Sequence, residues 1–369
     1  MKNENLLKLL KNLDMFHKTI PIFIISLFFL FNACDEPKEN PDDIYKYNML
    51  VLNEGLWNMN NSSITAYHTI TKKRSPDIFK VKNGRSLGDV ANDILLSGSK
   101  VYIAVNMSGL IEVIDVYTGK SIRQIPLLDE EGLNRQPRCL SSYKNKIFCC
   151  CFDGSVISID TATLKVDKIV YAGANPDGIC VSDNKLYVSN SGGLNYPNYG
   201  HTVSVFDVST LKALKTIQVG TNPTLIKADA YGDVYVLLKG NYNEIQSSLQ
   251  RIDVSIDTVV QTFSFQLSNY DIAGDLLYFY NYDYSNKVVA FQVLNVKTET
   301  IVNGNFLKDN VYINTPYAID VNPIDGSLLI TDALDYQSTG DVYCFDKNGK
   351  FKYSFEAGIC PKKIIFINK

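Results

Sequence analysis

Histidine is scarce in this chain, with three among 369 residues. His17 lies in an N-terminal leader segment, so only His68 and His201 remain as candidate imidazole ligands or bases. No Gly-x-Ser-x-Gly, His-Glu-x-x-His or EF-hand pattern occurs. These absences argue against a histidine-ligated metal site and against the common hydrolase mechanisms.

An excess of positive charge is lacking too. The 36 Lys and Arg residues stand against 39 Asp and Glu, and the net charge of −3 argues against a nucleic-acid-binding protein. Gly119-Lys120-Ser121 mimics the end of a phosphate loop, but Ile114 stands where that loop needs a glycine. What the chain does have is 46% hydrophobic residues, enough for a sizeable core.

The N-terminus lacks an apolar run long enough to span a membrane. Residues 21–31 form a run of 11, preceded by Lys18 and followed by Asn32-Ala33-Cys34. This pattern predicts that residues 1–34 are a signal peptide with a lipobox and that Cys34 is lipidated. Phe31 and Asn32 depart from the usual lipobox residues, and a start at Met15 would give a more usual signal peptide.

Residues 35–46 are acidic and proline-rich, which is typical of a flexible tether. An acidic run directly after a lipidated cysteine resembles the surface-export signal of some Gram-negative lipoproteins. The sequence therefore predicts an outer-membrane protein anchored by lipid at the cell surface.

Seven cysteines follow the predicted lipidation site, and no spacing between them matches a Cys-x-x-Cys metal pair. Most lie in apolar, strand-like patterns, which favours buried free thiols. The pattern leaves open one disulfide between adjacent strands, such as Cys139 with one of three consecutive cysteines. The seven are Cys139, Cys149, Cys150, Cys151, Cys180, Cys344 and Cys360.

A repeat is the strongest positive signal in the sequence. An apolar alternation ending in Asp, followed by a small turn, recurs roughly every 46 residues. Lys-apolar-Tyr-apolar segments and prolines recur in the same register. The repeated Asp residues are Asp115, Asp160, Asp207, Asp253 and Asp346. A period of this length with strand-type alternation predicts a β-propeller with one four-stranded antiparallel blade per repeat.

Aligning the repeats predicts an all-β, seven-bladed propeller over residues 47–369. Six blades lie near residues 87–127, 136–171, 175–219, 222–265, 269–302 and 315–356. The sixth blade in sequence order matches poorly, because Gln292 stands where Asp is expected. Strands at 47–52, 63–68 and 78–82 and a first strand at 361–369 are expected to form one blade that closes the ring. Residues 86–97 have helix-like spacing, but the register favours a loop and a first strand.

The connections between second and third strands are long in five of the seven predicted blades. Each carries aromatic or Asn residues, whereas the turns expected on the opposite face are short. Aromatic rings give large contact areas at low entropic cost, and amides give adaptable hydrogen bonds, so this face is predicted to bind a ligand. The alternative is tolerated insertions that use Asn as a turn former. The candidate site residues are Trp57, Asn58, Asn60, Arg135, Tyr196, Tyr199, Tyr242, Tyr282, Tyr284 and Tyr336.

The repeat motifs, such as Lys185-Leu186-Tyr187-Val188 and the Asn-Pro pairs that begin blades, resemble the YncE or surface-layer-type propeller family. Residues 52–60 and 87–94 are similar to surface lipoproteins of Gram-negative gut bacteria. Some of these, the BtuG type, are similar seven-bladed propellers that capture corrinoids such as vitamin B12 and pass them to an outer-membrane transporter. The resemblance implies a non-enzymatic, corrinoid-binding surface protein without a cofactor of its own.

Two alternatives remain open at this stage. One is a scaffold propeller that binds surface glycans or proteins. The other is an enzyme of the propeller lactonase or lyase kind, which would need a metal or a general base in the central channel.

Overall fold

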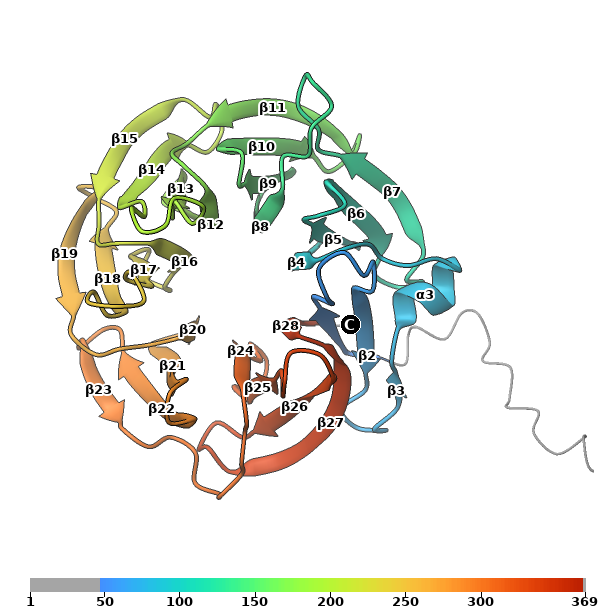
Figure 1. Ribbon diagram of the computed structural model, residues 1–369, viewed down its shortest axis with the longest axis vertical. Coiled ribbons are helices and arrows are strands. Elements are labelled where there is room, and N and C mark those ends of the chain that lie inside the picture. Colours follow the sequence, from blue (N-terminus) through green and yellow to red (C-terminus); the bar gives the residue numbers. More distant parts are fainter. Residues whose placement is uncertain (1–46, 368–369) are drawn as a thin grey trace, which may run out of the picture. The chain divides into compact units, whose positions relative to one another are not determined.

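The computed structural model describes residues 47–367, and these form seven four-stranded antiparallel sheets arranged as a ring (Figure 1). The predicted fold class and the number of blades are confirmed. The predicted signal peptide, Cys34 and the tether lie outside the described residues. Within those residues, no helix is both long enough and apolar enough to cross a membrane.

We number the blades 1 to 7 along the chain, and blade 1 contains both ends of the described chain. The innermost strands of blades 1 to 7 are β28 (Pro361–Phe366), β4 (Ala91–Ser97), β8 (Pro137–Tyr143), β12 (Pro176–Ser182), β16 (Pro223–Ala228), β20 (Asn269–Ala273) and β24 (Pro316–Val321). The second strands are β1 (Met49–Asn53), β5 (Lys100–Val105), β9 (Lys146–Cys151), β13 (Lys185–Asn190), β17 (Val234–Leu238), β21 (Leu276–Asp283) and β25 (Leu328–Asp332).

The outer half of each blade is built in the same way. The third strands are β2 (Ser63–Tyr67), β6 (Leu110–Asp115), β10 (Ser155–Asp160), β14 (Thr202–Asp207), β18 (Ser248–Asp253), β22 (Val288–Asn295) and β26 (Thr339–Phe345). The fourth strands are β3 (Arg74–Ser75), β7 (Ser121–Pro126), β11 (Lys165–Tyr171), β15 (Ala213–Gln218), β19 (Thr258–Phe263), β23 (Thr300–Asn303) and β27 (Phe351–Ile359).

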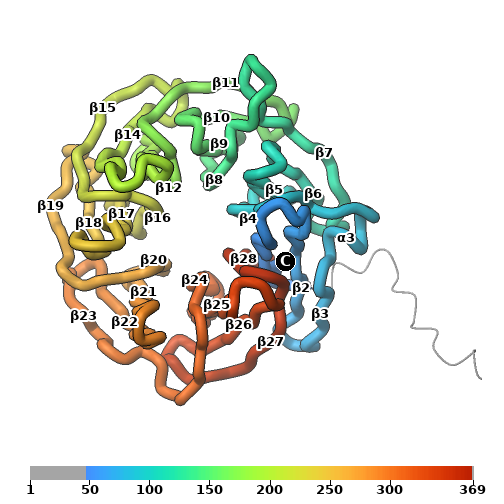
Figure 2. The backbone as a smooth tube through the Cα atoms, in the orientation of Figure 1, coloured from blue at the N-terminus to red at the C-terminus, as the bar shows by residue number. Residues whose placement is uncertain are grey.

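The two ends of the chain meet in blade 1. β28 pairs antiparallel with β1, with Leu50 opposite Ile365 and Val51 opposite Ile364. Figure 2 shows the red C-terminal strand beside the blue N-terminal segment. This closure removes open sheet edges from the ring, and it confirms the predicted first strand near residue 361.

The core of the described residues is divided into seven hydrophobic clusters, and each lies between two neighbouring blades. The inner strands are buried on both faces, as in β5, where five of the six residues are buried. The outermost strands, such as β15, expose most of their residues. Apolar residues therefore pack blade against blade, while the rim of the ring faces water.

The prediction of a strand at residues 78–82 is wrong, because this segment forms the short helix α3 (Ile78–Asn83). Asp77 caps its N-terminus by accepting from the backbone N–H of Lys80 at 3.1 Å, and Gly84 ends it in a left-handed conformation. Capping residues at both ends override the weak alternation between them. The fourth strand of blade 1 is instead the two-residue β3. Residues 86–97 contain a loop and β4, as predicted.

The turns after the third strands define one face of the ring, which we call the turn face together with the turns between first and second strands. Asp207, for example, accepts from the backbone N–H groups of Ser209 and Thr210 at 3.1 and 2.8 Å. Asp115 and Asp160 make the same two bonds, Asp253 accepts from the N–H of Ser255, and Asp346 accepts from the N–H groups of Asn348 and Lys350. These bonds explain why Asp recurs in the repeat, since it closes the turn after each strand.

The assignment of Gln292 to the Asp position of blade 6 is wrong. Asn295 takes that position, and its side-chain oxygen accepts from the N–H groups of Lys297 and Thr298. In blade 1 the Nδ1 of His68 plays the same part. The turn residue lies later than the repeat predicts because the third strand of this blade, β22, is eight residues long.

The opposite face, the loop face, carries the connections between second and third strands and those between blades. The two kinds of connection bond to each other: Asn222 donates its N–H to the carbonyl of Gly200 at 2.7 Å, and Lys239 donates its own to that of Asn222 at 2.9 Å. Four of the five predicted long connections are present. The prediction of a long connection in blade 6 is wrong, because β21 extends to Asp283 and β22 begins at Val288, which leaves only a tight turn between them.

Candidate functional site

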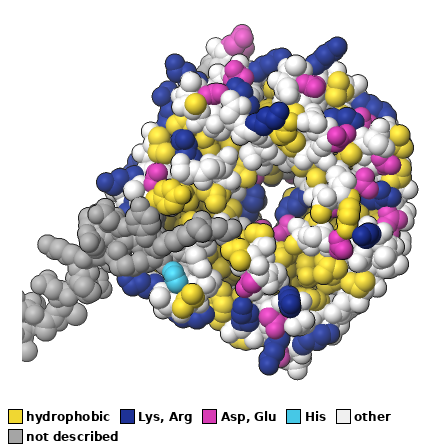
Figure 3. All heavy atoms as spheres, turned by 180° about the vertical axis from the view of Figure 1, so that it is seen from behind, with side chains coloured by type: hydrophobic (Ala, Val, Ile, Leu, Met, Phe, Trp, Pro, Cys, Tyr) yellow, Lys and Arg dark blue, Asp and Glu magenta, His cyan; other side chains and the backbone are white. Residues whose placement is uncertain are grey.

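A cavity of about 530 Å³ lies on the axis of the ring and is lined by residues from the innermost strands of all seven blades. In Figure 3, which views the ring from behind, the centre is hollowed and Lys and Arg side chains border the opening. The cavity volume falls in the range of small-molecule sites, about 300–1,000 Å³. We therefore take this channel and the loops around its mouth as the candidate site.

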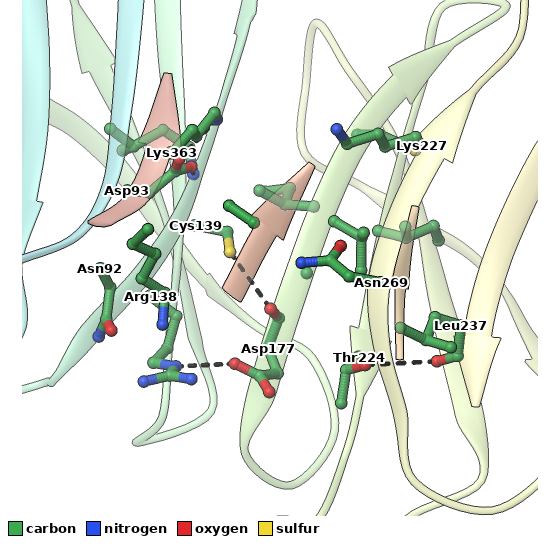
Figure 4. A pocket seen from close by; sticks show the side chains of 18 of the residues that line it. Asn92, Asp93, Arg138, Cys139, Asp177, Thr224, Lys227, Leu237, Asn269 and Lys363 are labelled. Atoms are coloured by element: carbon green, nitrogen blue, oxygen red, sulfur yellow. Dashed lines mark hydrogen bonds and ion pairs between the residues drawn. The ribbon is translucent and has the colours of Figure 1, made fainter. Parts of the chain in front are cut away.

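Ion pairs line the loop-face end of the cavity. Arg138, just after the proline that begins β8, binds Asp177 of β12 with Nε–Oδ1 at 2.7 Å (Figure 4). Burial by itself would lower the pKa of Arg138, but Asp177 raises it above its usual value. Lys362 of β28 binds both carboxylate oxygens of Glu54 at 3.1 Å. Arg138 is thereby held charged at the channel mouth, and Lys362 is paired there with Glu54.

Tyr317 of β24 joins this layer by donating its hydroxyl to Glu54. The ring also lies near the ammonium of Lys362, with 5.6 Å from Nζ to the ring centroid. Burial, followed by the charge of Glu54, raises the pKa of Tyr317 well above its usual value. Tyr317 therefore remains a hydrogen-bond donor at neutral pH.

Lys239 differs from the other cations of the cavity. Its ammonium donates to the backbone carbonyl of Ser268, and no ion pair within the described residues includes it. Burial lowers the pKa of Lys239 to about 8, the nearby Lys362 contributes to the shift, and Asp177 opposes it. The cavity thus contains one lysine whose charge is only partly compensated.

Asn92 of β4 also lines the cavity, and its side chain is left without partners. The residue is 4% exposed, and within the described residues neither its amide nitrogen nor its amide oxygen has a hydrogen-bond partner. A buried amide without partners costs about 1–3 kcal/mol. Such a group is what a binding site for a polar ligand would contain.

A second charged layer lies further along the channel toward the turn face. Lys363 binds Asp93 at 2.5 Å, and Lys227 binds Asp271 at 2.6 Å. Asp320 is 8% exposed and accepts from the N–H of Ile364 at 2.9 Å. Burial, then the nearby Asp271, raises the pKa of Asp320 to about 7, although Lys227 and Lys363 act in the opposite direction.

Tyrosines from four consecutive blades lie above this channel on the loop face. The rings of Tyr196 and Tyr199 of blade 4 are 6.1 Å apart, and Tyr199 is 6.0 Å from Tyr242 of blade 5. In blade 6 the rings of Tyr282 and Tyr284 are 4.6 Å apart. All of these are edge-to-face contacts, which are favourable for aromatic pairs.

The row of tyrosines continues in blade 7 and reaches into the channel. Tyr336 packs against Tyr317 with ring centroids 5.9 Å apart, and Tyr317 lines the cavity. Burial, then the adjacent Tyr284, raises the pKa of Tyr336. We call these seven residues the tyrosine arc: Tyr196, Tyr199, Tyr242, Tyr282, Tyr284, Tyr317 and Tyr336.

The long loops are tightly closed by their own backbones. Gly200 donates its N–H to the carbonyl of Ser191 at 2.7 Å, and a Cβ at Gly200 would collide with the carbonyl oxygen of Asn190. A Cβ at Gly240 would likewise collide with the carbonyl oxygen of Ile245. Loops held in this way present their aromatic side chains in a preorganised arrangement, which lowers the entropic cost of binding.

The predicted site residues do not all face the same surface. Tyr196, Tyr242 and Tyr284 are 74%, 70% and 67% exposed, whereas Tyr282 is only 7% exposed and belongs to the core. Tyr199 is a half-buried member of the tyrosine arc, and Tyr336 is 37% exposed. The structure therefore brings together all six tyrosines that the sequence singled out, and five of them are at least partly accessible.

The other predicted residues lie apart from the arc. Trp57 is 68% exposed in the loop of blade 1, where Asn58 and Asn60 have positive φ angles of 62° and 50°. Asn tolerates this conformation, so both also serve to turn the chain. Arg135 is 5% exposed and does not line the cavity, because its guanidinium binds Asp153 at 2.7 Å and the carbonyl of Leu128.

The polar residues of the channel were not predicted as site residues from the sequence, above all Asn92, Arg138, Lys239 and Tyr317. A usable signal existed, because the residue after the proline that begins an innermost strand lines the channel mouth in several blades. Arg138, Asp177, Thr224, Tyr317 and Lys362 all occupy this position.

Metal-ligating chemistry is not suggested by the side chains. Among residues 47–367, no group of three or more His, Cys, Asp and Glu side chains is placed to hold a metal ion. The seven cysteines of this part of the chain are free thiols, and Cys139 and Cys150 lie opposite each other in neighbouring strands without forming a disulfide.

A protein-family model described as "Domain of unknown function (DUF5074)" matches residues 47–359 of the chain. A search of curated proteins found no match. Among solved structures, a quinonprotein alcohol dehydrogenase-like protein from Bacteroides thetaiotaomicron is 16% identical, with a TM-score of 0.63 over 88% of this chain and 79% of the other. Hydrazine synthase of Kuenenia stuttgartiensis is 18% identical, with a TM-score of 0.57 over 69% and 76%. At these identities the likeness shows the fold alone.

Proposed function

We propose that this chain, which belongs to the DUF5074 family, is a non-enzymatic ligand-binding propeller, and that its ligand is a corrinoid such as vitamin B12. The observation that supports binding is the tyrosine arc, which spans four blades above a polar axial cavity of about 530 Å³. Rigid aromatic surfaces around a concave polar centre are typical of small-molecule sites.

A corrinoid suits such a surface for chemical reasons. It is large, flat and rich in amides, so its macrocycle would rest on the aromatic loop face rather than enter the channel. Peripheral amide groups would then meet the exposed Asn side chains and the polar groups at the mouth. The sequence resemblance to corrinoid-capturing surface lipoproteins points to the same ligand.

Calorimetry with cyanocobalamin tests this proposal. The propeller of residues 45–369 is suitable, because it contains every strand of the closed ring. We expect heat of binding at micromolar protein, and weaker binding by Trp57→Ala and Tyr196→Ala variants with unchanged melting temperatures. A well-folded sample that releases no heat would remove the corrinoid proposal. Variants that unfold would show that these side chains support the fold instead.

We further propose that the protein is a lipid-anchored protein of the outer-membrane surface that hands its ligand to an outer-membrane transporter. The support is the lipobox pattern at Cys34 and the acidic segment that follows it. A Cys34→Ser variant of the full chain should leave the membrane fraction, and protease added to intact cells should digest the wild-type protein. A wild-type protein that resists protease until cells are opened would contradict surface exposure.

A further inference from the structure

We infer that Lys239, Arg138 and Asn92 form an anion-binding position at the mouth of the channel, which takes a carboxylate or phosphate group of the ligand. This inference deepens the proposed function, because it assigns a charge and a chemical class to the ligand of the same cavity. The tyrosine arc would contact the flat part of the ligand, while the anionic group would enter the channel.

The charges around the mouth are unevenly paired. Arg138 is paired with Asp177 and Lys362 with Glu54, whereas Lys239 has only the carbonyl of Ser268. Three cations therefore face two carboxylates in the described part of the mouth. An ammonium taken out of water without a countercharge is costly, and an incoming anion would remove that cost.

The geometry of Arg138 also favours an anion at the mouth. Its Nε–H is held by Asp177, and its guanidinium lies over the ring of Phe152, 4.2 Å from the centroid. No other hydrogen bond of this guanidinium involves the residues that the structure describes. The plane of Arg138 is thus fixed while its terminal N–H groups remain available, an arrangement suited to carboxylate or phosphate oxygens.

Asn92 lies on β4, which packs beside β8, the strand that carries Arg138. Figure 4 shows the Asn92 side chain beside that of Arg138 in the wall of the cavity. The amide of Asn92 is buried without a partner. Its N–H groups can donate to an anion, and this would satisfy a group whose isolation is otherwise unfavourable.

Titration with inorganic phosphate and with acetate tests the inference on the propeller of residues 45–369. We expect millimolar binding at pH 7 and constant ionic strength, with a preference that tells a phosphate site from a carboxylate site. Lys239→Met should weaken binding at least tenfold. Lys308→Met is the matched control, because the ammonium of Lys308 also donates to a backbone carbonyl but is exposed on the loop between blades 6 and 7.

A pH series on the wild-type protein keeps the test independent of any variant. Burial lowers the pKa of Lys239 to about 8, and the charged groups that act on it are Asp177 and Lys362, so its ammonium loses its charge as the pH rises through 8. Anion affinity should therefore fall as the pH rises from 7 to 9, even though phosphate itself becomes more negative. Binding that stays constant or strengthens over this range would overturn the assignment of Lys239.

Corrinoid probes separate this inference from the proposed function. Cyanocobalamin carries a phosphodiester in its nucleotide loop, and dicyanocobinamide lacks it, so the former should bind more tightly and should lose that advantage in Lys239→Met. If cyanocobalamin binds with an affinity that neither added phosphate nor the Lys239→Met change lowers, the anion position is wrong and the proposed function stands. If phosphate binds through Lys239 but no corrinoid binds, the anion position stands and the corrinoid is wrong. No binding of either anion would refute the inference.

Discussion

The two faces of the propeller differ in how strictly they repeat. On the turn face, six blades close the turn after the third strand with Asp or Asn, and blade 1 does so with His68. On the loop face, the connections between second and third strands range from the three residues of 152–154 in blade 3 to the 11 residues of 191–201 in blade 4. The turn face is the more uniform of the two, and its turns only connect consecutive strands.

The difference teaches where this sequence is free to vary. A turn that closes a hairpin has few solutions, so the same side-chain bonds recur. A loop above the channel has no such constraint, and its residues can be used for contact with a ligand. The variable loops are nevertheless rigid, because their glycines lie against the backbone of the same loop.

Glycine replacement should have the largest effect. Gly200→Ala places a Cβ against the carbonyl of Asn190 at the base of a loop, and we expect a loss of about 2–3 kcal/mol in the free energy of unfolding. Gly98→Ala on the turn face has open space around it and should cost only about 1 kcal/mol, for its positive φ. Urea denaturation measures both, and equal losses would show that the loop is not tightly packed.

Tyrosine removal should separate the faces by binding. Tyr242→Ala on the loop face should weaken cyanocobalamin binding about tenfold or more, because it removes a ring from the tyrosine arc. Tyr231→Ala is the control, since Tyr231 is 53% exposed in the turn between β16 and β17 on the turn face. Calorimetry should find its affinity unchanged. A similar loss in both variants would contradict a one-sided site.

The turn-face side of the channel should respond to pH through Asp320. Its pKa of about 7 in the folded state lies above the usual unfolded value near 4, so the wild-type protein loses stability as the pH rises from 4 through 7. Asp320→Asn keeps an oxygen for the N–H of Ile364 and removes the buried charge. We expect it to stabilise the protein by about 1–3 kcal/mol at pH 8 and not at pH 4.

Denaturation at the two pH values measures this difference. Asp183→Asn, in the exposed turn between β12 and β13, should leave stability unchanged at both. A gain in Asp320→Asn that is the same at pH 4 and pH 8 would show that the carboxyl is not protonated in the folded protein.

The smallest effect is expected at the repeated turns. Asp207→Asn should leave the melting temperature at pH 7 unchanged, because Asn295 already closes the same turn in blade 6. Hydrogen bonds from Thr210 lower the pKa of Asp207, so its contribution is lost as the pH falls below about 4, whereas that of Asn is not. A large loss at pH 7 would show that the negative charge, rather than the turn geometry, is needed.

The fold could be predicted because its signals are local and repeated. Proline at the start of the innermost strands and Asp at the end of the third strands set the register of seven blades, and the structure confirms it. The errors arose where a local feature was stronger than the repeat. Asp77 and Gly84 enclose a helix, and Asn295 replaces an Asp at a shifted position.

The site could be predicted only in part. Tyrosines in long loops were visible as a departure from the repeat, and they do lie on one face. Arg135 lies in a connection on that face and was predicted to bind the ligand, but its guanidinium forms an ion pair with Asp153 within the fold. Lys239 and Asn92 gave no signal, because a single lysine or asparagine within a repeat is common.

What the sequence by itself determined is the period, and with it the strands, the turns and the closure of the ring, because alternation and turn-forming residues act over short distances along the chain. Only the tertiary structure decided which side chains meet on the axis. Residues from seven blades, which repeat roughly every 46 positions along the chain, are brought into one cavity by the radial packing of the blades. Whether a lysine there is paired with a carboxylate depends on neighbours from other blades.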